Sequence, residues 1–66
     1  MPSLSARELE ILRHLVRGSI NRQIASDLGI TEAAVNVQLR EIFRKLGVKN
    51  RSQARVWARD NGIDAC

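Results

Sequence analysis

Apolar residues recur at helical spacing along the chain, and glycines and short polar residues interrupt the pattern. Four segments carry an apolar face with a period of about 3.6 residues, at about residues 6–17, 21–28, 32–46 and 51–61. A glycine follows each segment, which is typical of a helix end. No segment alternates at period two, so no strand is predicted. The pattern therefore predicts an all-α fold, a four-helix bundle.

The third segment has the narrowest apolar face. Val35, Leu39, Ile42 and Leu46 lie at i, i+4, i+7 and i+11, on one side of a helix. The residues predicted to face the core in the other segments are Leu9, Leu12 and Val16 with Ile11 and Leu15 beside them, then Ile24, Ala25 and Leu28, and finally Ala54, Trp57 and Ala58.

Polar residues mark the starts of the first and last helices. Ser5 and Glu8 fit the capping box, in which a serine caps the helix and a glutamate three residues later reaches back to the cap. Asn50 and Gln53 repeat the arrangement in a looser form.

Only residues 29–31 separate the second segment from the third. Thr31 caps the third helix, whereas Ser19 and Asn21 both qualify as the cap of the second. A three-residue turn that contains glycine, between a short helix and a longer one, is the helix–turn–helix layout. In that layout the second helix of the pair enters the major groove of DNA, so residues 32–46 are predicted to be a recognition helix.

The side of the third helix opposite its apolar face carries residues that suit a base-pair edge. At about 100° per residue, Ala33, Val37, Arg40 and Arg44 point outward, with Asn36 on their flank. An arginine can donate two hydrogen bonds to guanine, an asparagine can pair with adenine, and a valine can contact a thymine methyl. We predict that Asn36, Val37 and Arg40 read bases and that Arg44 reaches phosphate. The alternative is an ordinary solvated face.

The charge is concentrated in the second half of the chain. The formal net charge is +4, and seven bases lie between residues 40 and 59 with Glu41 as the single acid there. These bases are Arg40, Arg44, Lys45, Lys49, Arg51, Arg55 and Arg59. A basic region on an otherwise balanced domain favours a polyanionic partner, and a merely solubilising surface is the alternative.

Hydrogen-bond donors stand at the starts of three predicted helices. They are Asn21 and Arg22, then Thr31, then Lys49, Asn50 and Arg51. A helix N-terminus favours an anion, and contacts to phosphate do not depend on base sequence. These positions are therefore predicted to contact DNA phosphates, although each alone also fits a cap or a solvated charge.

Length and composition set further limits. Sixty-six residues form one small domain with no room for a large enclosed pocket. The single cysteine, Cys66, cannot form an internal disulfide, which favours a cytoplasmic protein. No apolar run is long enough for a membrane span or a signal peptide. The abrupt start before Leu4 suggests a domain cut from a longer protein, with Met1 added as a start codon.

Residues 4–62 resemble the DNA-binding domain of the LuxR family, the GerE-like helix–turn–helix found at the C-terminus of many bacterial response regulators. The resemblance rests on LSARELEIL, NRQIASDLGIT, AAVNVQLREIFRKLGV and KNRSQA, and the phrase IFRKLGVKNRSQA is specific. It implies a bacterial transcriptional regulator whose third helix reads double-stranded DNA and whose fourth helix forms a homodimer.

The recognition helix departs from the family pattern at two positions. The family helix commonly begins Thr-Val-Lys-x-His, and the matching residues here are 34–38, Ala-Val-Asn-Val-Gln. Asn36 and Gln38 thus replace the lysine and the histidine. The fold is expected to be unaffected, and the base preference is left open.

The resemblance also implies individual contacts. The base-reading positions of the family coincide with the outward set described above, and its backbone contacts fall near Asn21, Lys45 and Lys49. Ser52 and Val56, one turn apart on the outer side of the last helix, would form the dimer surface. The polar Ser52 suggests a weak dimer in the isolated domain, and a half-exposed core residue at position 56 is the alternative.

In the intact protein the resemblance implies an N-terminal receiver or ligand-binding domain that controls DNA binding. RNA polymerase is a further candidate partner of the intact protein. A free-standing regulator is the alternative.

Two other classes of function fit less of the sequence. A helical protein-interaction module, or a domain like region 4 of a sigma factor, would hold an acidic partner with the last helix and the basic residues. An enzyme is not expected, because His14 falls on the polar, solvent-facing side of the first helix, out of reach of the terminal Cys66. No metal-ligand spacing occurs and no cofactor is predicted.

Overall fold

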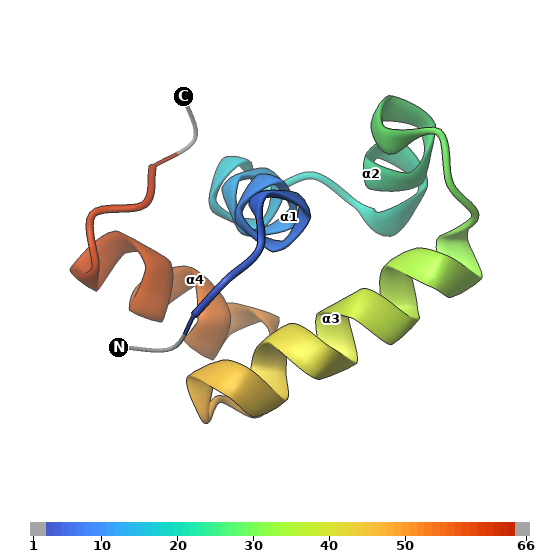
Figure 1. Ribbon diagram of the computed structural model, residues 1–66. Coiled ribbons are helices and arrows are strands. Elements are labelled where there is room, and N and C mark those ends of the chain that lie inside the picture. Colours follow the sequence, from blue (N-terminus) through green and yellow to red (C-terminus); the bar gives the residue numbers. More distant parts are fainter. Residues whose placement is uncertain (1–2, 65–66) are drawn as a thin grey trace.

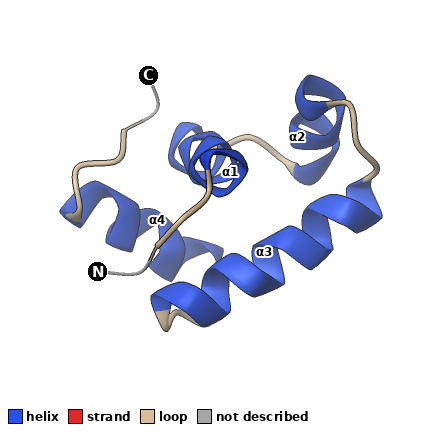
Figure 2. Cartoon of the chain, viewed as in Figure 1, coloured by secondary structure: helices blue, strands red, loops and turns tan. Residues whose placement is uncertain are grey.

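Four helices joined by short turns make up the domain in the computed structural model, which describes residues 3–64 (Figures 1 and 2). The helices are α1 (Ala6–Arg17), α2 (Asn21–Leu28), α3 (Glu32–Leu46) and α4 (Arg51–Asp60). No strand occurs among the described residues. The predicted all-α fold and the first three helix ranges are confirmed. The last helix is one residue shorter than predicted, because the backbone of Asn61 leaves the helical region at φ −104° and ψ 17°.

The longest helix, α3, runs along one edge of the domain with α1 and α2 on its inner side (Figure 1). Its 15 residues give a length of about 22 Å at about 1.5 Å per residue, against 28 Å for the longest dimension of the domain. The central helix α1 packs against both α3 and α4. Within residues 3–64, none of the helices is both long enough and apolar enough to cross a bilayer.

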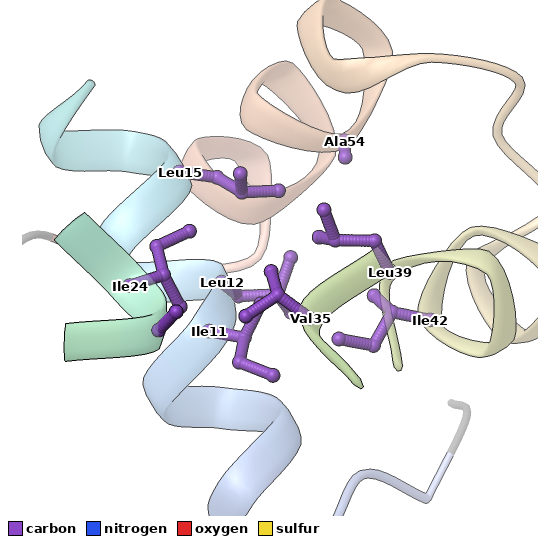
Figure 3. Packing of buried hydrophobic residues seen from close by; sticks show 9 residues of the cluster. Ile11, Leu12, Leu15, Ile24, Val35, Leu39, Ile42 and Ala54 are labelled. Atoms are coloured by element: carbon purple, nitrogen blue, oxygen red, sulfur yellow. The ribbon is translucent and has the colours of Figure 1, made fainter. Parts of the chain in front are cut away.

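The core gathers apolar side chains from all four helices (Figure 3). Those with no exposed surface are Ile11, Leu12, Leu15, Ile24, Val35, Ile42, Ala54 and Ala58. Leu39 is buried beside them and Leu46 is partly buried at the end of α3. The predicted apolar stripe of the third helix is therefore confirmed, and it fixes which side of α3 faces the solvent.

The buried face of α1 differs from the predicted one. Ile11 and Leu15 are fully buried, whereas Leu9 and Val16 are only half-buried. The core-facing side is therefore turned about the helix axis relative to the prediction. The periodicity of one helix could not show this, because α1 is covered by α3 and α4 from two directions.

The prediction that His14 is solvent-exposed is wrong, since only 6% of its surface is exposed. Its ring contacts residues of α1, of the following turn and of α2. Nδ1 lies 3.2 Å from an Arg17 nitrogen and 3.3 Å from Ser19 Oγ, and Nε2 lies 3.8 Å from Asp27 Oδ2. An arginine can only donate, so Nδ1 accepts and Nε2 carries the proton that faces Asp27. The neighbours Ser19 and Asp27 come from the following turn and from α2, and helical period alone does not reveal them.

The caps of α1 and α3 form as predicted. Glu8 N–H donates to Ser5 Oγ at 3.1 Å, and Ser5 N–H donates to Glu8 Oε1 at 2.9 Å. At the start of α3, Ala34 N–H donates to Thr31 Oγ1 at 3.0 Å.

The caps of the other two helices depart from the prediction. Ile20 precedes α2, and its N–H donates to Gln23 Oε1 at 3.0 Å, so neither candidate cap residue is used. At α4, Gln53 N–H donates to Asn50 Oδ1 at 2.9 Å as expected. Gln53 Oε1, however, accepts from Lys49 N–H at 2.8 Å rather than from the cap residue itself.

The turn between α2 and α3 is sharp because Gly29 adopts a left-handed conformation, with φ +68° and ψ 34°. Gly29 N–H donates to Ser26 O at 3.3 Å and Ile30 N–H donates to Ala25 O at 3.0 Å, which closes the end of α2. Ile30 packs on the core. The three-residue turn predicted from the sequence is thus confirmed.

An ion pair joins the start of α1 to the end of α3. Lys45 Nζ lies 2.9 Å from both carboxylate oxygens of Glu8, and the Glu8 side chain is only 11% exposed. The hydrogen-bonded Lys45 ammonium holds the pKa of Glu8 below its ordinary value, and the Ser5 N–H adds to this against the opposing effect of burial. Glu8 therefore serves α1 as a cap and α3 as an ion-pair partner.

Two valines of α3 test the rotation of that helix. Val35 has no exposed surface and Val37 is 58% exposed. Val35→Ala is expected to lower the free energy of unfolding by about 2 kcal/mol, through lost apolar burial and the cavity left behind. Val37→Ala is expected to change it by no more than about 0.5 kcal/mol. Urea unfolding followed by circular dichroism measures both, and equal losses would contradict the observed orientation of α3.

The Glu8–Lys45 pair makes stability depend on pH. Because folding lowers the pKa of Glu8, its contribution is fully present above the ordinary glutamate pKa of about 4.3 and is lost as the pH falls through the lower folded value. Glu8→Gln keeps an acceptor for the cap, so this variant should be less stable at neutral pH and lose less stability on acidification. Glu10→Gln, at an exposed position of α1, is the control and should follow the wild-type profile. Parallel acid profiles for Glu8→Gln and the wild type would count against the pair.

Candidate nucleic-acid interface

The outer side of α3 presents the three predicted base-reading side chains together. Asn36, Val37 and Arg40 are all exposed. Val37, at 58%, is one of the few large apolar side chains that the described residues leave open to solvent. Arg40 forms no hydrogen bond or ion pair with the other residues that the structure describes. Its guanidinium is therefore available to an external ligand.

A shallow hollow lies beside this surface, between α3 and the start of α4. Asn36, Leu39, Arg40, Phe43 and Arg51 line it. Its rim carries polar and cationic groups from two helices, and its apolar atoms come from residues that are themselves buried or half-buried. The arrangement gives a surface on which hydrogen-bond donors surround an apolar patch.

Three polar side chains from three helices are joined by hydrogen bonds at the edge of the hollow. Arg51, the first residue of α4, donates to Asn21 Oδ1. Asn21, the first residue of α2, donates from Nδ2 to Asn36 Oδ1 on α3 at 2.7 Å. The structure therefore brings together two predicted phosphate contacts and one predicted base-reading residue.

The other donors at helix starts serve partly as caps. Thr31 Oγ1 and Asn50 Oδ1 accept from backbone N–H groups of α3 and α4, which leaves the Asn50 NH2 group with donors to offer. Arg22 and Lys49 are exposed at the starts of α2 and α4. Their predicted role toward phosphate stays a prediction.

Two of the predicted phosphate contacts are paired with carboxylates. Arg44 Nη2 lies 2.5 Å from Glu41 Oε2, with both side chains exposed. Lys45 is held by Glu8 as described above. An exposed pair of this kind is weak and exchanges readily with another anion, whereas the buried Glu8 carboxylate holds Lys45 more firmly.

The outer side of α4 carries a second surface. Val56 is 47% exposed and Ser52 is exposed. Both line an open groove together with Val48 and Trp57. The predicted dimer residues thus lie next to each other on a partly apolar surface.

Sequence reasoning missed the contacts between helices. The line Arg51–Asn21–Asn36 joins residues 30 and 15 positions apart, and the pair Glu8–Lys45 joins residues 37 apart. The available signal was only that each residue is polar and stands near a helix end or on a helix flank. No local pattern states which of them meet.

A metal site does not occur in the part of the chain that the structure describes, since no group of three or more His, Cys, Asp or Glu side chains could hold an ion there. The positions of Met1 and Cys66, which entered the sequence-based expectations, lie outside the described residues.

Known proteins match most of the chain. Residues 2–58 match the family described as "Bacterial regulatory proteins, luxR family" (GerE). The chain is 48% identical over 58 residues to the probable csgAB operon transcriptional regulatory protein of Salmonella typhimurium, covering 88% of this chain and 27% of that protein. It is 45% identical over 53 residues to the nitrate/nitrite response regulator protein NarP of Escherichia coli, covering 80% and 25%.

A third relative and a solved structure agree with these matches. The transcriptional regulatory protein LiaR of Bacillus subtilis is 42% identical over 61 residues, covering 92% of this chain and 29% of that protein. The crystal structure of the response regulator ChrA, of a heme-sensing two-component system, superimposes with a TM-score of 0.87 at 48% identity, covering 96% of this chain and 31% of that one. The chain thus spans between a quarter and a third of the length of these relatives.

Proposed function

This chain belongs to the luxR family of bacterial regulatory proteins, and we propose that it is a sequence-specific, double-stranded DNA-binding domain of a bacterial transcriptional regulator. The observation that carries the proposal is the outer side of α3. There Asn36, Val37 and Arg40 are exposed side by side on a helix that follows a sharp three-residue turn. The transcriptional regulators among its relatives support the same assignment.

In the proposed complex, α3 lies in the major groove. Arg40 donates two hydrogen bonds to guanine O6 and N7, and Val37 contacts a thymine methyl. Asn36 contacts a neighbouring base. Arg40 suits this role because its guanidinium is exposed and has no partner within the described residues.

The proposed contacts to the DNA backbone come from helix starts and basic residues. They are Asn21, Arg22, Thr31, Arg44, Lys45, Lys49, Asn50 and Arg51. Positive charge and backbone N–H groups at a helix start attract phosphate irrespective of base sequence. Arg44 can exchange its exposed carboxylate partner for a phosphate, whereas Lys45 would have to leave a partly buried one.

We further propose that two copies pair through the outer side of α4, around Ser52 and Val56. A dimer places two recognition helices on half-sites whose spacing follows the symmetry of the protein. The half-exposed Val56 supplies apolar area for such a contact. The polar Ser52 beside it keeps the contact weak, so DNA would stabilise it.

The intact protein is proposed to carry this unit as its effector domain. The chain spans only a part of its relatives, and the named response regulators among them support a receiver or ligand-binding domain on its N-terminal side. The proposed place of action is the cytoplasm, where bacterial DNA lies. Contact with RNA polymerase stays a prediction.

Arg40 and Lys49 separate base reading from backbone binding. Arg40→Ala is expected to cost about 1–3 kcal/mol on the specific site and to relax the preference at one base position. Lys49→Ala should weaken binding to all DNA sequences alike. It should also make the slope of log K against log salt shallower by about 1. With about five phosphates contacted, log K against log salt should slope by about −4 to −5 per subunit.

Fluorescence anisotropy with a selected site and with random DNA, over a range of salt, measures these quantities. Equal losses on both DNAs for Arg40→Ala would remove Arg40 from base reading. Absence of binding to random DNA even at low salt would favour a protein-interaction module over the proposed function.

Val56 tests the proposed dimer. Val56→Ser introduces no charge, so binding to a duplex with one half-site should be unchanged. On a duplex with two half-sites, affinity should fall by about 1–3 kcal/mol, because two copies of Val56 no longer bury apolar surface. Analytical gel shifts on the two duplexes provide the comparison, and unchanged affinity for both would contradict a dimer through α4.

A further inference from the structure

The hydrogen bonds that join Arg51, Asn21 and Asn36 have a fixed direction. A guanidinium has five N–H donors and no acceptor, so the Asn21 atom that faces Arg51 must be Oδ1. Asn21 then turns its Nδ2 toward Asn36 and donates to Asn36 Oδ1 at 2.7 Å. The acceptor end of Asn36 is thereby directed at α2. The direction of the whole line originates at Arg51, which is the one member that cannot reverse its role.

We propose that this line, the Arg51–Asn21–Asn36 relay, sets the base specificity of the domain by making Asn36 present its NH2 group, and not its carbonyl oxygen, to DNA. The inference rests on the proposed function and deepens it. Arg51 and Asn21 act as positioning residues, and Asn36 is the residue that touches the base. Three helices contribute one member each, so the orientation of the amide depends on the assembled bundle.

The consequence follows from the edges that bases show in the major groove. Guanine presents two acceptors, adenine one acceptor and one donor, thymine one acceptor, and cytosine a donor only. An unrestrained asparagine favours adenine because it uses both ends of its amide. With Oδ1 directed toward Asn21 on α2, Asn36 does not point that oxygen at the adenine amino group. It should then accept guanine at least as well as adenine and disfavour cytosine.

The neighbouring Arg40 strengthens this preference. Arg40 also only donates, and both side chains line the same hollow. The surface of α3 beside the hollow therefore offers donors to two adjacent positions. A sequence with consecutive guanine acceptors is the expected target of this part of the domain.

The sharpest test reverses the direction of the relay. In Asn21→Asp the new carboxylate still accepts from Arg51, but it can only accept from Asn36 as well. Asn36 must then donate inward and turn Oδ1 outward, so the preference at its base should move from guanine toward cytosine or adenine. A carboxylate in the first turn of α2 is favourable for the helix, so the variant is expected to fold.

The experiment measures dissociation constants for duplexes that carry each of the four bases in turn at every position of the site. Asn36→Ala locates the relevant position as the one where the four-base profile becomes flat. There the wild type should bind the guanine duplex about 5- to 100-fold more tightly than the cytosine duplex. Asn21→Asp should reverse that order. Arg51→Gln, whose amide can accept as well as donate, should bring the two duplexes within a few-fold of each other.

Gln23→Glu is the matched charge control. It adds the same negative charge to the same turn of α2 and keeps an acceptor for Ile20 N–H. It should weaken binding to all four duplexes alike without changing their order of affinity. Circular dichroism on heating confirms that each variant is folded.

Two results would overturn the relay, namely a profile for Asn21→Asp that keeps the wild-type order, or a wild-type preference for adenine far above guanine. Either result would leave DNA binding by α3 intact. Failure of the wild type to bind any duplex at low salt would instead overturn the proposed function itself.

Discussion

The burial of one apolar stripe fixes how α3 is rotated about its axis, and the outward surface depends on that rotation. Val35, Leu39 and Ile42 are buried against the other helices, and burial of each such side chain contributes about 1.5–3 kcal/mol. A rotation by one residue, about 100°, would expose part of this stripe. In one direction it would bury Asn36 and Arg40, and in the other Gln38 and Glu41, at the cost of desolvating polar and charged groups. Burial of the apolar stripe therefore determines which residues lie on the outer side of α3.

A domain of this size buries little apolar surface. Several polar contacts also connect its helices. Arg55 Nε donates to the carbonyl oxygen of Leu15 at 2.9 Å, which places a cation at the C-terminal end of α1. Ala54 and Ala58, both fully buried, let α4 pack against α1. His14 and Asp27 connect α1 with α2. The Arg55 contact satisfies a carbonyl oxygen near the end of α1, and all of these contacts help to fix the relative positions of the helices.

The same contacts alter what the basic half of the chain can do. Lys45 and Arg44 are paired with carboxylates, which reduces their share of the positive field. Arg51 and Arg55 donate to neutral oxygens, which hold the two side chains in place without offsetting their positive charge. The basic half of the chain therefore combines charges held in place with exposed ones such as Arg40 and Lys49. Counting the bases along the chain could not make this distinction.

The amino-acid sequence by itself determined the four helices, the turn at Gly29 and the outward position of Arg40, because each depends on residues within a few positions of one another. Helical period, helix caps and a left-handed glycine act over one or two turns of the chain. The α2 cap was not determined in this way, because the side chains of Ser19 and Asn21 contact other helices instead.

Only the tertiary structure decided which face of α1 is covered, that His14 is buried, and which polar groups meet across helices. The Glu8–Lys45 pair and the Arg51–Asn21–Asn36 relay join residues that are far apart in the chain. Whether a polar side chain finds a partner depends on how the helices pack, and packing is a property of the whole core rather than of any one segment. The orientation of Asn36, and with it the base that it is proposed to prefer, belongs to this second group.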